Sequence, residues 1–306
     1  MNDKGGLKPL LIMISGGRTS AYMAHLCKQH LSDTRELIYI FVNTAQEDAD
    51  TYRYLSDVDK NFNLNVVWLE AVIHDKLGQG ITHKVVTYET ASRNGEPFEA
   101  MIEKHGIPNN ATPFCTSKLK LAPVDSYLRE QGLTGIERAI GIREDENRRV
   151  SKSATKDHII YPLIDMWPCD KQDVLDFWSE YEWDLQIPEW RGNCVTCLKK
   201  SFGKLLKVYQ ETPEAFDFNL EMEEKYGRSG PRFDPARSSH GLDVDTLPNN
   251  VFHRGAKPTK ALIEEFQLII ATDAPLRPED EIDTGTCAES CEMYETEQLD
   301  FFGEAK

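Results

Sequence analysis

An apolar run that ends in two glycines and opens a helix-like stretch is the feature that most constrains how this chain can fold. Residues 11 to 20 read Leu-Ile-Met-Ile-Ser-Gly-Gly-Arg-Thr-Ser, and residues 21 to 30 continue with a helical pattern. A strand, a tight turn and a helix N-terminus form a cradle for an anion, because glycines let the backbone approach closely and the first helical turn has unpaired N–H groups. Ser15, Thr19 and Ser20 add hydroxyl donors. We therefore expect this segment to bind the phosphates of a nucleotide.

This segment differs from two common phosphate-binding motifs. It lacks the Gly-Lys-Ser/Thr ending of a Walker loop and the third glycine of the dinucleotide-binding fingerprint. An ordinary strand-to-helix turn therefore stays open as the alternative.

The composition is that of a globular chain. It has 306 residues, of which 40% are hydrophobic, enough for one large α/β domain with an extension or for two domains. The N-terminal apolar run is far shorter than the roughly 18 residues of a membrane span, and no small-residue cleavage site follows it, so we expect a soluble, cytoplasmic protein without a membrane partner. The net charge of −16 is concentrated in residues 208 to 306. A polyanion could approach only the neutral middle of the chain, so nucleic acid is neither supported nor excluded as a partner.

Strand-like and helix-like stretches alternate along the first 165 residues, which predicts a parallel sheet with crossover helices. The expected strands are 10–14, 36–42, 65–69, 139–142 and 159–162, and the expected helices are 19–30, 48–61, 116–131 and 171–181. A polar region follows the third strand. Helical patterns at 213–226 and 259–270 predict a helical extension, and the last 35 residues predict a mobile, acidic tail. We therefore expect an α/β domain over residues 1–205 and an extension with its tail over 206–306.

Five short segments, taken in order, carry a resemblance to a known family. They are Ile14-Ser-Gly-Gly-Arg-Thr-Ser20; Phe41-Val-Asn-Thr-Ala-Gln-Glu-Asp-Ala-Asp-Thr-Tyr52; Cys115-Thr-Ser-Lys-Leu-Lys-Leu-Ala-Pro123; Gly141-Ile-Arg-Glu-Asp-Glu-Asn-Arg148; and Ile160-Tyr-Pro-Leu-Ile-Asp-Met-Trp167, which runs on to Cys194-Val-Thr-Cys197. Together they resemble the phosphoadenosine phosphosulfate (PAPS) reductase family of the PP-loop adenine nucleotide α-hydrolase superfamily. The resemblance covers about two-thirds of the chain and excludes the last hundred residues.

The resemblance implies a Rossmann-like parallel sheet with helices on both faces and an adenine nucleotide, ATP or PAPS, at the carboxyl ends of the strands. The residues that it places around the nucleotide are Ser15, Gly16, Gly17, Arg18, Thr19, Ser20, Asn43, Lys118, Gly141 and Arg148. Two positions depart from the family. Thr19 stands where ATP-dependent members usually have Asp, and Asn43 stands where the family has an acidic residue. A magnesium ion would then find its nearest carboxylates at Glu47 and Asp48.

Three of the seven cysteines lie at family positions. Cys194 and Cys197 form a Cys-x-x-Cys ligand knuckle, and Cys115 matches a cysteine of the related iron–sulfur enzymes, whereas Phe114 replaces a second one. Three cysteines can hold a [4Fe–4S] cluster that leaves one iron open to a sulfur ligand. Structural zinc and free or redox-active thiols are the alternatives.

Other cysteines and two lysines bear on this site. Cys169, Cys287 or Cys291 could supply a fourth ligand, and the last two could instead provide a mobile nucleophile. Acidic neighbours raise the pKa of a thiol, so we favour the interpretation that the two tail cysteines are spectators. Lys199 and Lys200 beside the knuckle would lower the pKa of its thiols.

Arginines follow the expected strand that ends at Gly141. Arg143, Arg148 and Arg149 could each bind a phosphate or sulfate through both arms of the guanidinium group. The alternative is that they are surface residues paired with the acidic residues 144 to 146.

These observations predict an adenine-nucleotide-dependent enzyme that handles sulfur, with Cys115, Cys194, Cys197 and Arg143 as its catalytic residues. Sulfur transfer to an unidentified acceptor through a cluster is the favoured reaction, with a sulfur-donor or electron-donor protein as partner. One alternative is a PAPS-type reductase that uses a tail cysteine. The other is a non-catalytic nucleotide-binding module of a larger complex.

Overall fold

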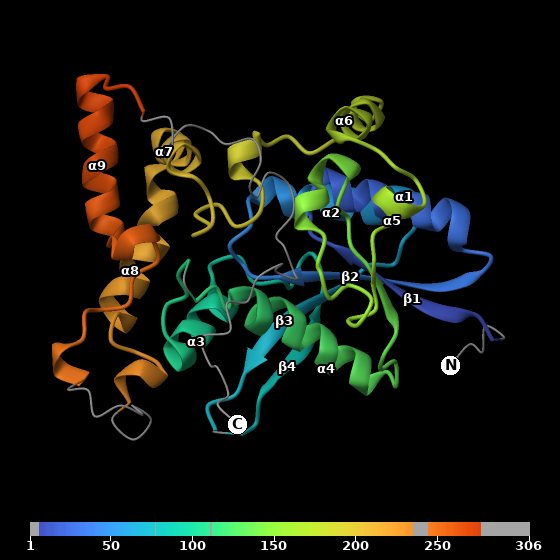
Figure 1. The fold of residues 1–306 in the computed structure, drawn as a ribbon, viewed down its shortest axis with the longest axis horizontal. Coiled ribbons are helices and arrows are strands. Elements are labelled where there is room, and N and C mark those ends of the chain that lie inside the picture. Colours follow the sequence, from blue (N-terminus) through green and yellow to red (C-terminus); the bar gives the residue numbers. More distant parts are fainter. Residues whose placement is uncertain (1–5, 77, 111, 235–243, 277–306) are drawn as a thin grey trace.

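The computed structural model describes residues 6–276 apart from positions 77, 111 and 235–243, and a six-stranded sheet lies at its centre (Figure 1). The strand order is β4-β3-β2-β1-β5-β6. The strands are β1 (Lys8–Ile14), β2 (Arg35–Asn43), β3 (Val67–Ile73), β4 (Ile81–Val86), β5 (Glu137–Ala139) and β6 (Ile159–Ile160). Neighbours pair in parallel except β3 and β4, which pair antiparallel. The predicted α/β fold with a largely parallel sheet is confirmed.

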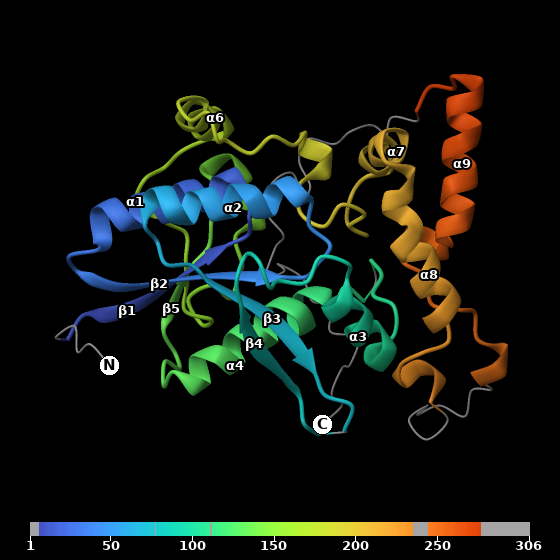
Figure 2. The same ribbon diagram turned by 180° about the vertical axis from the view of Figure 1, so that it is seen from behind.

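Helices cover both faces of this sheet, as the two opposite views show (Figures 1 and 2). Helices α1, α2 and α6 lie over one face, and α3 and α4 lie over the other. The helices of this part of the chain are α1 (Arg18–Leu31), α2 (Ala49–Phe62), α3 (Glu96–His105), α4 (Ala122–Glu130), α5 (Pro162–Asp165) and α6 (Lys171–Ser179). Within the described residues, no helix has the length and apolar character needed to cross a membrane.

Strand β1 supplies side chains to two separate cores, because successive residues of a strand point to opposite faces of a sheet. Leu10, Ile12 and Ile14 pack in a cluster with residues of α1 and α2. Leu11 and Met13 pack in a second cluster with residues of α4. These five side chains are all buried. The continuous apolar run therefore marks a central strand that is covered on both sides.

The remaining helices form an extension beside α3 (Figure 1). They are α7 (Phe202–Glu211), α8 (Asp217–Tyr226) and α9 (Thr259–Thr272). Phe218 of α8 meets Phe98 of α3 with ring centroids 5.9 Å apart. The half-buried Glu223 of α8 accepts hydrogen bonds from the backbone N–H and the hydroxyl of Thr259 (2.8 Å each), which caps α9. The predicted helical extension is confirmed, whereas the predicted acidic tail, residues 277–306, lies outside the described residues.

Several elements differ from the sequence-based expectation. The polar region after β3 contains the edge strand β4 and helix α3. Helix α7 was not predicted at all. The helix expected over 116–131 is a π-helix at Thr116–Leu121 followed by α4. The Ala122 N–H bonds to the Ser117 carbonyl, five residues earlier, and Pro123 has no N–H with which to restore the ordinary α-helical pattern there.

Candidate functional site

The segment Ser15–Ser20, here called the phosphate loop, has the strand–turn–helix geometry that was predicted. The backbone N–H of Ser15 donates to Ser20 Oγ (3.0 Å), and Ser20 Oγ donates to the Gly17 carbonyl (3.0 Å). Gly16 has a φ of +86°, and a Cβ there would lie 2.5 Å from a methyl carbon of Thr51. Glycine is therefore required at position 16 by both the backbone conformation and the space available.

A cavity of 220 Å³ adjoins the phosphate loop, and we call it the phosphate cavity. A single ordered water needs about 10–15 Å³, so the cavity is far larger than a water site. It lies between the loop, the first turns of α2 and α6, and the segment 185–193. Its lining residues are Ser15, Gly16, Gly17, Arg18, Thr51, Lys171, Leu175, Leu185, Ile187, Pro188, Glu189, Gly192 and Asn193.

Gly141 and Arg143, which were predicted to contact the nucleotide, both lie against the phosphate loop. A Cβ on Gly141 would lie 2.9 Å from Cα of Ser20, so this glycine allows the close approach of two backbones. Arg143 Nη1 donates to Thr19 Oγ1 (2.9 Å), and its Nε donates to Asp145 (2.9 Å). Arg143 is only 3% exposed and, like Gly141 and Thr19, is not among the residues that line the phosphate cavity.

The other arginines have different surroundings. Arg18 of the loop turns toward Asp184, to which its Nε and Nη2 both donate at 2.8 Å. Arg149 is buried and pairs with Glu146, whereas Arg148 is exposed. The alternative of surface arginines with acidic partners is therefore only half correct: the pairing is present, but Arg143 and Arg149 are buried.

Asn43, also predicted to contact the nucleotide, lies at the end of β2 and is fully buried. Its amide donates to Glu70 (2.7 Å) and to the Ser92 carbonyl (2.8 Å), and its oxygen accepts from the Ala45 N–H and from the Tyr52 hydroxyl (2.9 Å each). These four contacts use the whole hydrogen-bonding capacity of the side chain. Asn43 therefore holds the loop after β2 in shape rather than offering a polar atom to a ligand.

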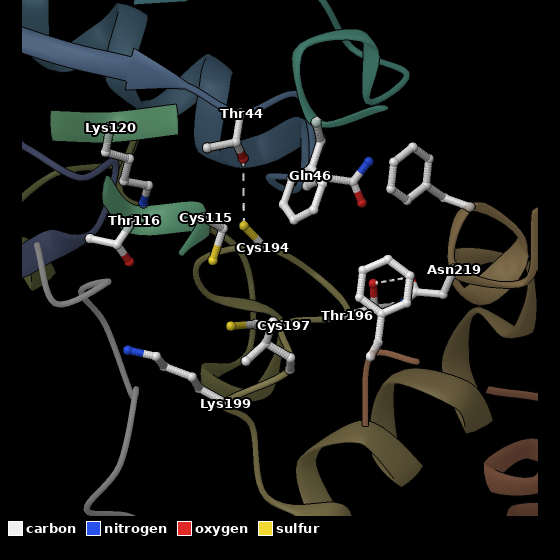
Figure 3. A pocket seen from close by; sticks show the side chains of 14 residues that line it. Thr44, Gln46, Cys115, Thr116, Lys120, Cys194, Thr196, Cys197, Lys199 and Asn219 are labelled. Atoms are coloured by element: carbon white, nitrogen blue, oxygen red, sulfur yellow. Dashed lines mark hydrogen bonds between the residues drawn. The ribbon is translucent and has the colours of Figure 1, made fainter. Parts of the chain in front are cut away.

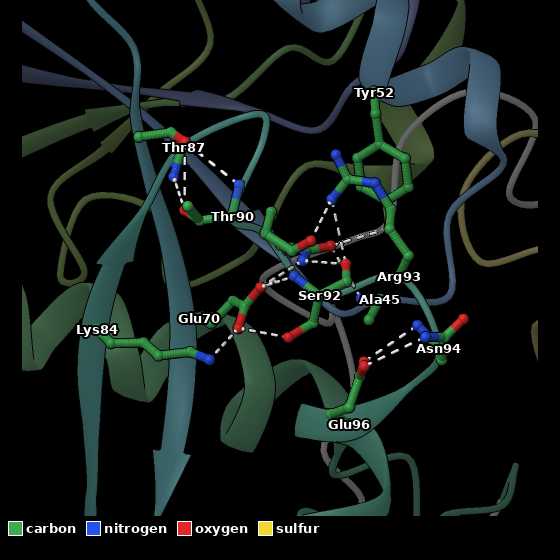
Figure 4. Close-up of polar contacts among 12 residues, drawn as sticks. Ala45, Tyr52, Glu70, Lys84, Thr87, Thr90, Ser92, Arg93, Asn94 and Glu96 are labelled. Atoms are coloured by element: carbon green, nitrogen blue, oxygen red, sulfur yellow. Dashed lines mark hydrogen bonds and ion pairs between the residues drawn. The ribbon is translucent and has the colours of Figure 1, made fainter.

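Glu70 is the charged centre of the network in Figure 4 and is completely buried. Burial alone would raise the pKa of this carboxyl, but the Lys84 ammonium at 2.7 Å and hydrogen bonds from Ser92 and Asn43 lower it below its ordinary value. Next to this network, the Arg93 guanidinium lies 3.9 Å from the ring centroid of Tyr52. The loop that follows β4 is in this way fastened to the carboxyl end of β2 and to the middle of β3.

Glu47 and Asp48, the carboxylates nearest to a magnesium site in the prediction, are both bound to protein groups. Glu47 accepts from the Thr44 hydroxyl (2.7 Å) and from the Tyr52 hydroxyl (3.0 Å). Asp48 caps α2 and pairs with Arg191 at 2.6 Å. The structure therefore gives no support to a magnesium site at these two residues.

The three cysteines singled out in the sequence line one pocket, the cysteine pocket (Figure 3). Cys115 precedes the π-helix, whereas Cys194 and Cys197 belong to the segment before α7. The residues that line the pocket are Thr44, Gln46, Phe98, Cys115, Thr116, Lys120, Cys194, Thr196, Cys197, Leu198, Lys199, Phe218, Asn219 and Phe252. No carboxylate is among these described lining residues, although the chain as a whole is strongly acidic.

The segment with the Cys-x-x-Cys motif is attached to the loop after β2. The Val195 N–H donates to the Gln46 carbonyl (2.8 Å), and Thr44 Oγ1 lies 3.5 Å from Cys194 Sγ. Because the Thr44 hydroxyl donates to Glu47, the Cys194 thiol is the donor to Thr44 in this pair. Thr44 thus fixes the orientation of the Cys194 side chain.

Two buried lysines, Lys200 and Lys204, follow this segment in the chain. Lys200 donates to the Val195 carbonyl (2.8 Å), and burial lowers its pKa to about 8, although the nearby Cys197 and Cys194 oppose that shift. Lys204 is completely buried and pairs with Glu189 at 3.1 Å. The charge of Lys204 is one of the groups that lower the pKa of Lys200.

The remaining cysteines lie elsewhere. Cys27 and Cys169 are buried, and burial raises the pKa of each thiol to about 12. Cys169 does not line the cysteine pocket, and Cys287 and Cys291 lie outside the described residues. Among the described residues, no group of three or more His, Cys, Asp or Glu side chains is arranged as a metal site. The cluster therefore stays a prediction.

Sequence reasoning missed several residues that the structure brings to the site. Thr116 is 6% exposed, lines the cysteine pocket, and its hydroxyl has no hydrogen-bond partner among the described residues. Lys120 also lines this pocket, and Lys171 and Glu189 line the phosphate cavity. The predicted Lys118 lies half-buried in the π-helix and lines neither cavity. A π-helix often occurs at a functional site, but the spacing of apolar residues in a sequence does not distinguish it from an α-helix.

Consecutive residues of one chain segment line the two cavities. Gly192 and Asn193 line the phosphate cavity, and the next residue, Cys194, lines the cysteine pocket together with Cys197. The two cavities therefore meet at consecutive residues, Asn193 and Cys194.

Known proteins match this chain to different extents. No family model matches the chain. An uncharacterized protein of Methanocaldococcus jannaschii is 25% identical over 228 residues, a match that covers 70% of this chain and 47% of that protein. Among solved structures, a PAPS reductase from Candida auris, in complex with phosphate, is 17% identical with a TM-score of 0.34 over 56% of this chain and 71% of that one.

The uncharacterized nin region protein ORF290 of Escherichia phage lambda is 31% identical over 301 residues. The match covers 95% of this chain and 97% of the phage protein. The chain therefore belongs to the same family as the phage lambda nin region protein ORF290.

Proposed function

We propose that this protein is an adenine-nucleotide-dependent enzyme that handles sulfur, and that it transfers sulfur to an acceptor. The observation that carries this proposal is the segment that lines both cavities, because it sets the loop that we propose to bind phosphate beside three thiols. The five sequence segments that resemble PAPS reductases add support for the adenine nucleotide. In this proposal the activated group is held at the phosphate loop and the sulfur chemistry takes place in the cysteine pocket.

The phosphate loop would bind the nucleotide through backbone N–H groups at the start of α1, helped by the Ser15 hydroxyl. Arg143, which is held beside the loop by its hydrogen bond to Thr19, would place a positive charge near the phosphates. A buried guanidinium near developing negative charge stabilises it more strongly than one in water does. In the cysteine pocket, Thr44 would hold Cys194 toward the reacting sulfur.

We base the cluster on the donor chemistry of the cysteine pocket, since its three cysteines are not arranged as a metal site in the described residues. Three thiols face one largely apolar space, and soft thiolate ligands select such clusters. Cys115, Cys194 and Cys197 would hold the group. It would supply an iron with an open coordination position to which a sulfur atom can bind. Magnesium lacks comparable support, because Glu47 and Asp48 already bind protein groups.

A sulfonucleotide reductase is the second candidate, and the Arg143–Thr19 contact favours it. A guanidinium beside the loop can neutralise a phosphate or sulfate without a metal ion. In that case PAPS would be the substrate.

Calorimetry with ATP and with PAPS tests the nucleotide part of the proposal. Gly17 lines the phosphate cavity and has an extended backbone (φ −98°, ψ 160°) that valine can adopt. Gly17→Val should therefore block the phosphates without disturbing the fold, which circular dichroism would check. Binding of neither nucleotide by the wild-type protein, or unchanged binding by a folded Gly17→Val variant, would refute the assignment of the loop.

Iron and sulfide content after anaerobic purification tests the sulfur part. Cys194→Ala and Cys115→Ala should remove the iron, whereas Cys169→Ala is the matched control, because its thiol lies outside the cysteine pocket. Protein without iron, or with bound zinc, would count against cluster-based transfer.

A further inference from the structure

We propose that Lys171 binds the phosphates of the nucleotide by exchanging its ion pair with Glu189 for one with the ligand. This inference rests on the proposed function, because it concerns the same nucleotide site. Lys171 is the first residue of α6 and lines the phosphate cavity together with the loop residues Ser15 to Arg18. It therefore faces the phosphate loop from a segment about 150 residues away in the sequence.

The phosphate loop contains no lysine, and its nearby arginines are already held by carboxylates. Arg18 forms a two-armed contact with Asp184 and also donates to the Leu185 carbonyl. Arg143 is held by Asp145 and is almost fully buried. Neither guanidinium can turn to a ligand without breaking such a pair. Lys171 differs, because its side chain is 37% exposed and sits on a flexible stem of four carbons.

Glu189 is shared by two lysines, which makes the exchange inexpensive. Its carboxylate accepts from Lys171 at 2.9 Å and from Lys204 at 3.1 Å, and Lys204 is completely buried. Burial opposes ionisation of Glu189, but the two ammonium groups lower the pKa of its carboxyl below the ordinary value. When Lys171 leaves, Glu189 keeps Lys204, so no buried carboxylate is left without a cation.

The charges favour the phosphate over Glu189 as the partner of Lys171. Three ion pairs beside the cavity combine three cations, Arg18, Lys171 and Lys204, with two carboxylates, Asp184 and Glu189. Within these three pairs the cations outnumber the carboxylates by one, although the chain as a whole has a net charge of −16. A nucleotide phosphate chain carries more negative charge than a single carboxylate and attracts the ammonium more strongly. Lys171 would thus distinguish phosphorylated nucleotides from nucleosides.

Calorimetry with adenosine, ATP and inorganic tripolyphosphate tests this inference. Lys171→Met keeps the apolar stem but removes the charge, and it should weaken binding of ATP and of tripolyphosphate by about 10- to 100-fold, the value of one charge-assisted hydrogen bond. Binding of adenosine should not change. Lys171→Arg should restore ATP binding to within about threefold. Lys60→Met, at the exposed far end of α2, is the matched control and should bind ATP like the wild type.

The outcomes separate this inference from the proposed function. Equal ATP binding by the wild type and Lys171→Met would overturn the role of Lys171 and leave the nucleotide function intact. Binding of tripolyphosphate but not of ATP, with tripolyphosphate lost in Lys171→Met, would support Lys171 and refute the adenine nucleotide. A loss of adenosine binding equal to the loss of ATP binding would show that Lys171 is only structural. Binding of none of the three probes by the wild type would overturn both proposals.

Discussion

The buried ring of His253 should make the stability of this protein depend on pH between about 4 and 6.5. The side chain is 5% exposed, and neither ring nitrogen has a hydrogen-bond partner among the described residues. It lies near the rings of Phe216 and Phe252, with centroids 6.4 Å away in each case. Burial, with a smaller contribution from the Lys257 charge, lowers the pKa of His253 from 6.5 to about 4.

The sign and size of the effect follow from linkage. Between the two pKa values the unfolded chain binds the proton and the folded chain does not, so acid favours unfolding. The stabilisation is fully present above pH 6.5 and is lost as the pH falls toward 4. A difference of about 2.5 pKa units corresponds to roughly 3 kcal/mol in total, of which about 2 kcal/mol is lost by pH 5.

Urea denaturation at pH 7 and pH 5, followed by tryptophan fluorescence, measures this loss. His253→Phe removes the titrating group, so its free energy of unfolding should fall by about 2 kcal/mol less than that of the wild type between these pH values. Other titrating groups are common to both proteins and cancel in the comparison. His30→Gln, a change at an exposed histidine, is the control and should behave like the wild type. An equal fall in the wild type and His253→Phe would refute the reasoning.

Two further predictions compare a buried side chain with a more exposed side chain of the same residue type. Iodoacetamide should modify the cysteines of the cysteine pocket at least tenfold faster than Cys27 and Cys169, because burial shields these two thiols and raises the pKa of each to about 12. Peptide mass spectrometry of the native protein measures the rate of labelling at each cysteine. Early labelling of Cys27 would contradict the prediction. Glu70→Gln should lower the free energy of unfolding by about 1.5–3 kcal/mol, because it removes the charge that accepts hydrogen bonds from Lys84 and its neighbours. Exposed Glu36→Gln, by contrast, should change it by less than about 0.5 kcal/mol in the same urea titration.

The structure was predicted best where a single pattern, an apolar run or a pair of glycines, was sufficient to identify an element. The apolar run of β1 has no polar residue between Pro9 and Ser15, which is typical of a strand covered on both faces. The glycines that follow it fixed the position of the turn before α1. The same argument failed for β4, because its half-polar sequence at the sheet edge resembles that of a loop.

Buried charged and polar groups were not predictable in the same way. Helix α7 buries Lys204, and a lysine in a sequence is ordinarily taken as a solvent-facing residue, which hides the apolar face of the helix. Asn43 was predicted as a ligand because it ends a strand. Whether its amide is free depends on Glu70 and Ser92, whose approach is a property of the folded chain.

The place of β1 in the sheet has a consequence for how the chain folds as it is synthesised. Its partner β2 follows almost at once, but its other partner β5 pairs Glu137 with Leu10 and so emerges about 130 residues later. At a synthesis rate of 5–20 residues per second, one edge of this apolar strand waits roughly 6–25 s for its neighbour. During that interval it can pair with strands of other nascent chains. Slow translation between β2 and β5 would therefore favour aggregation of this protein even when its finished fold is stable.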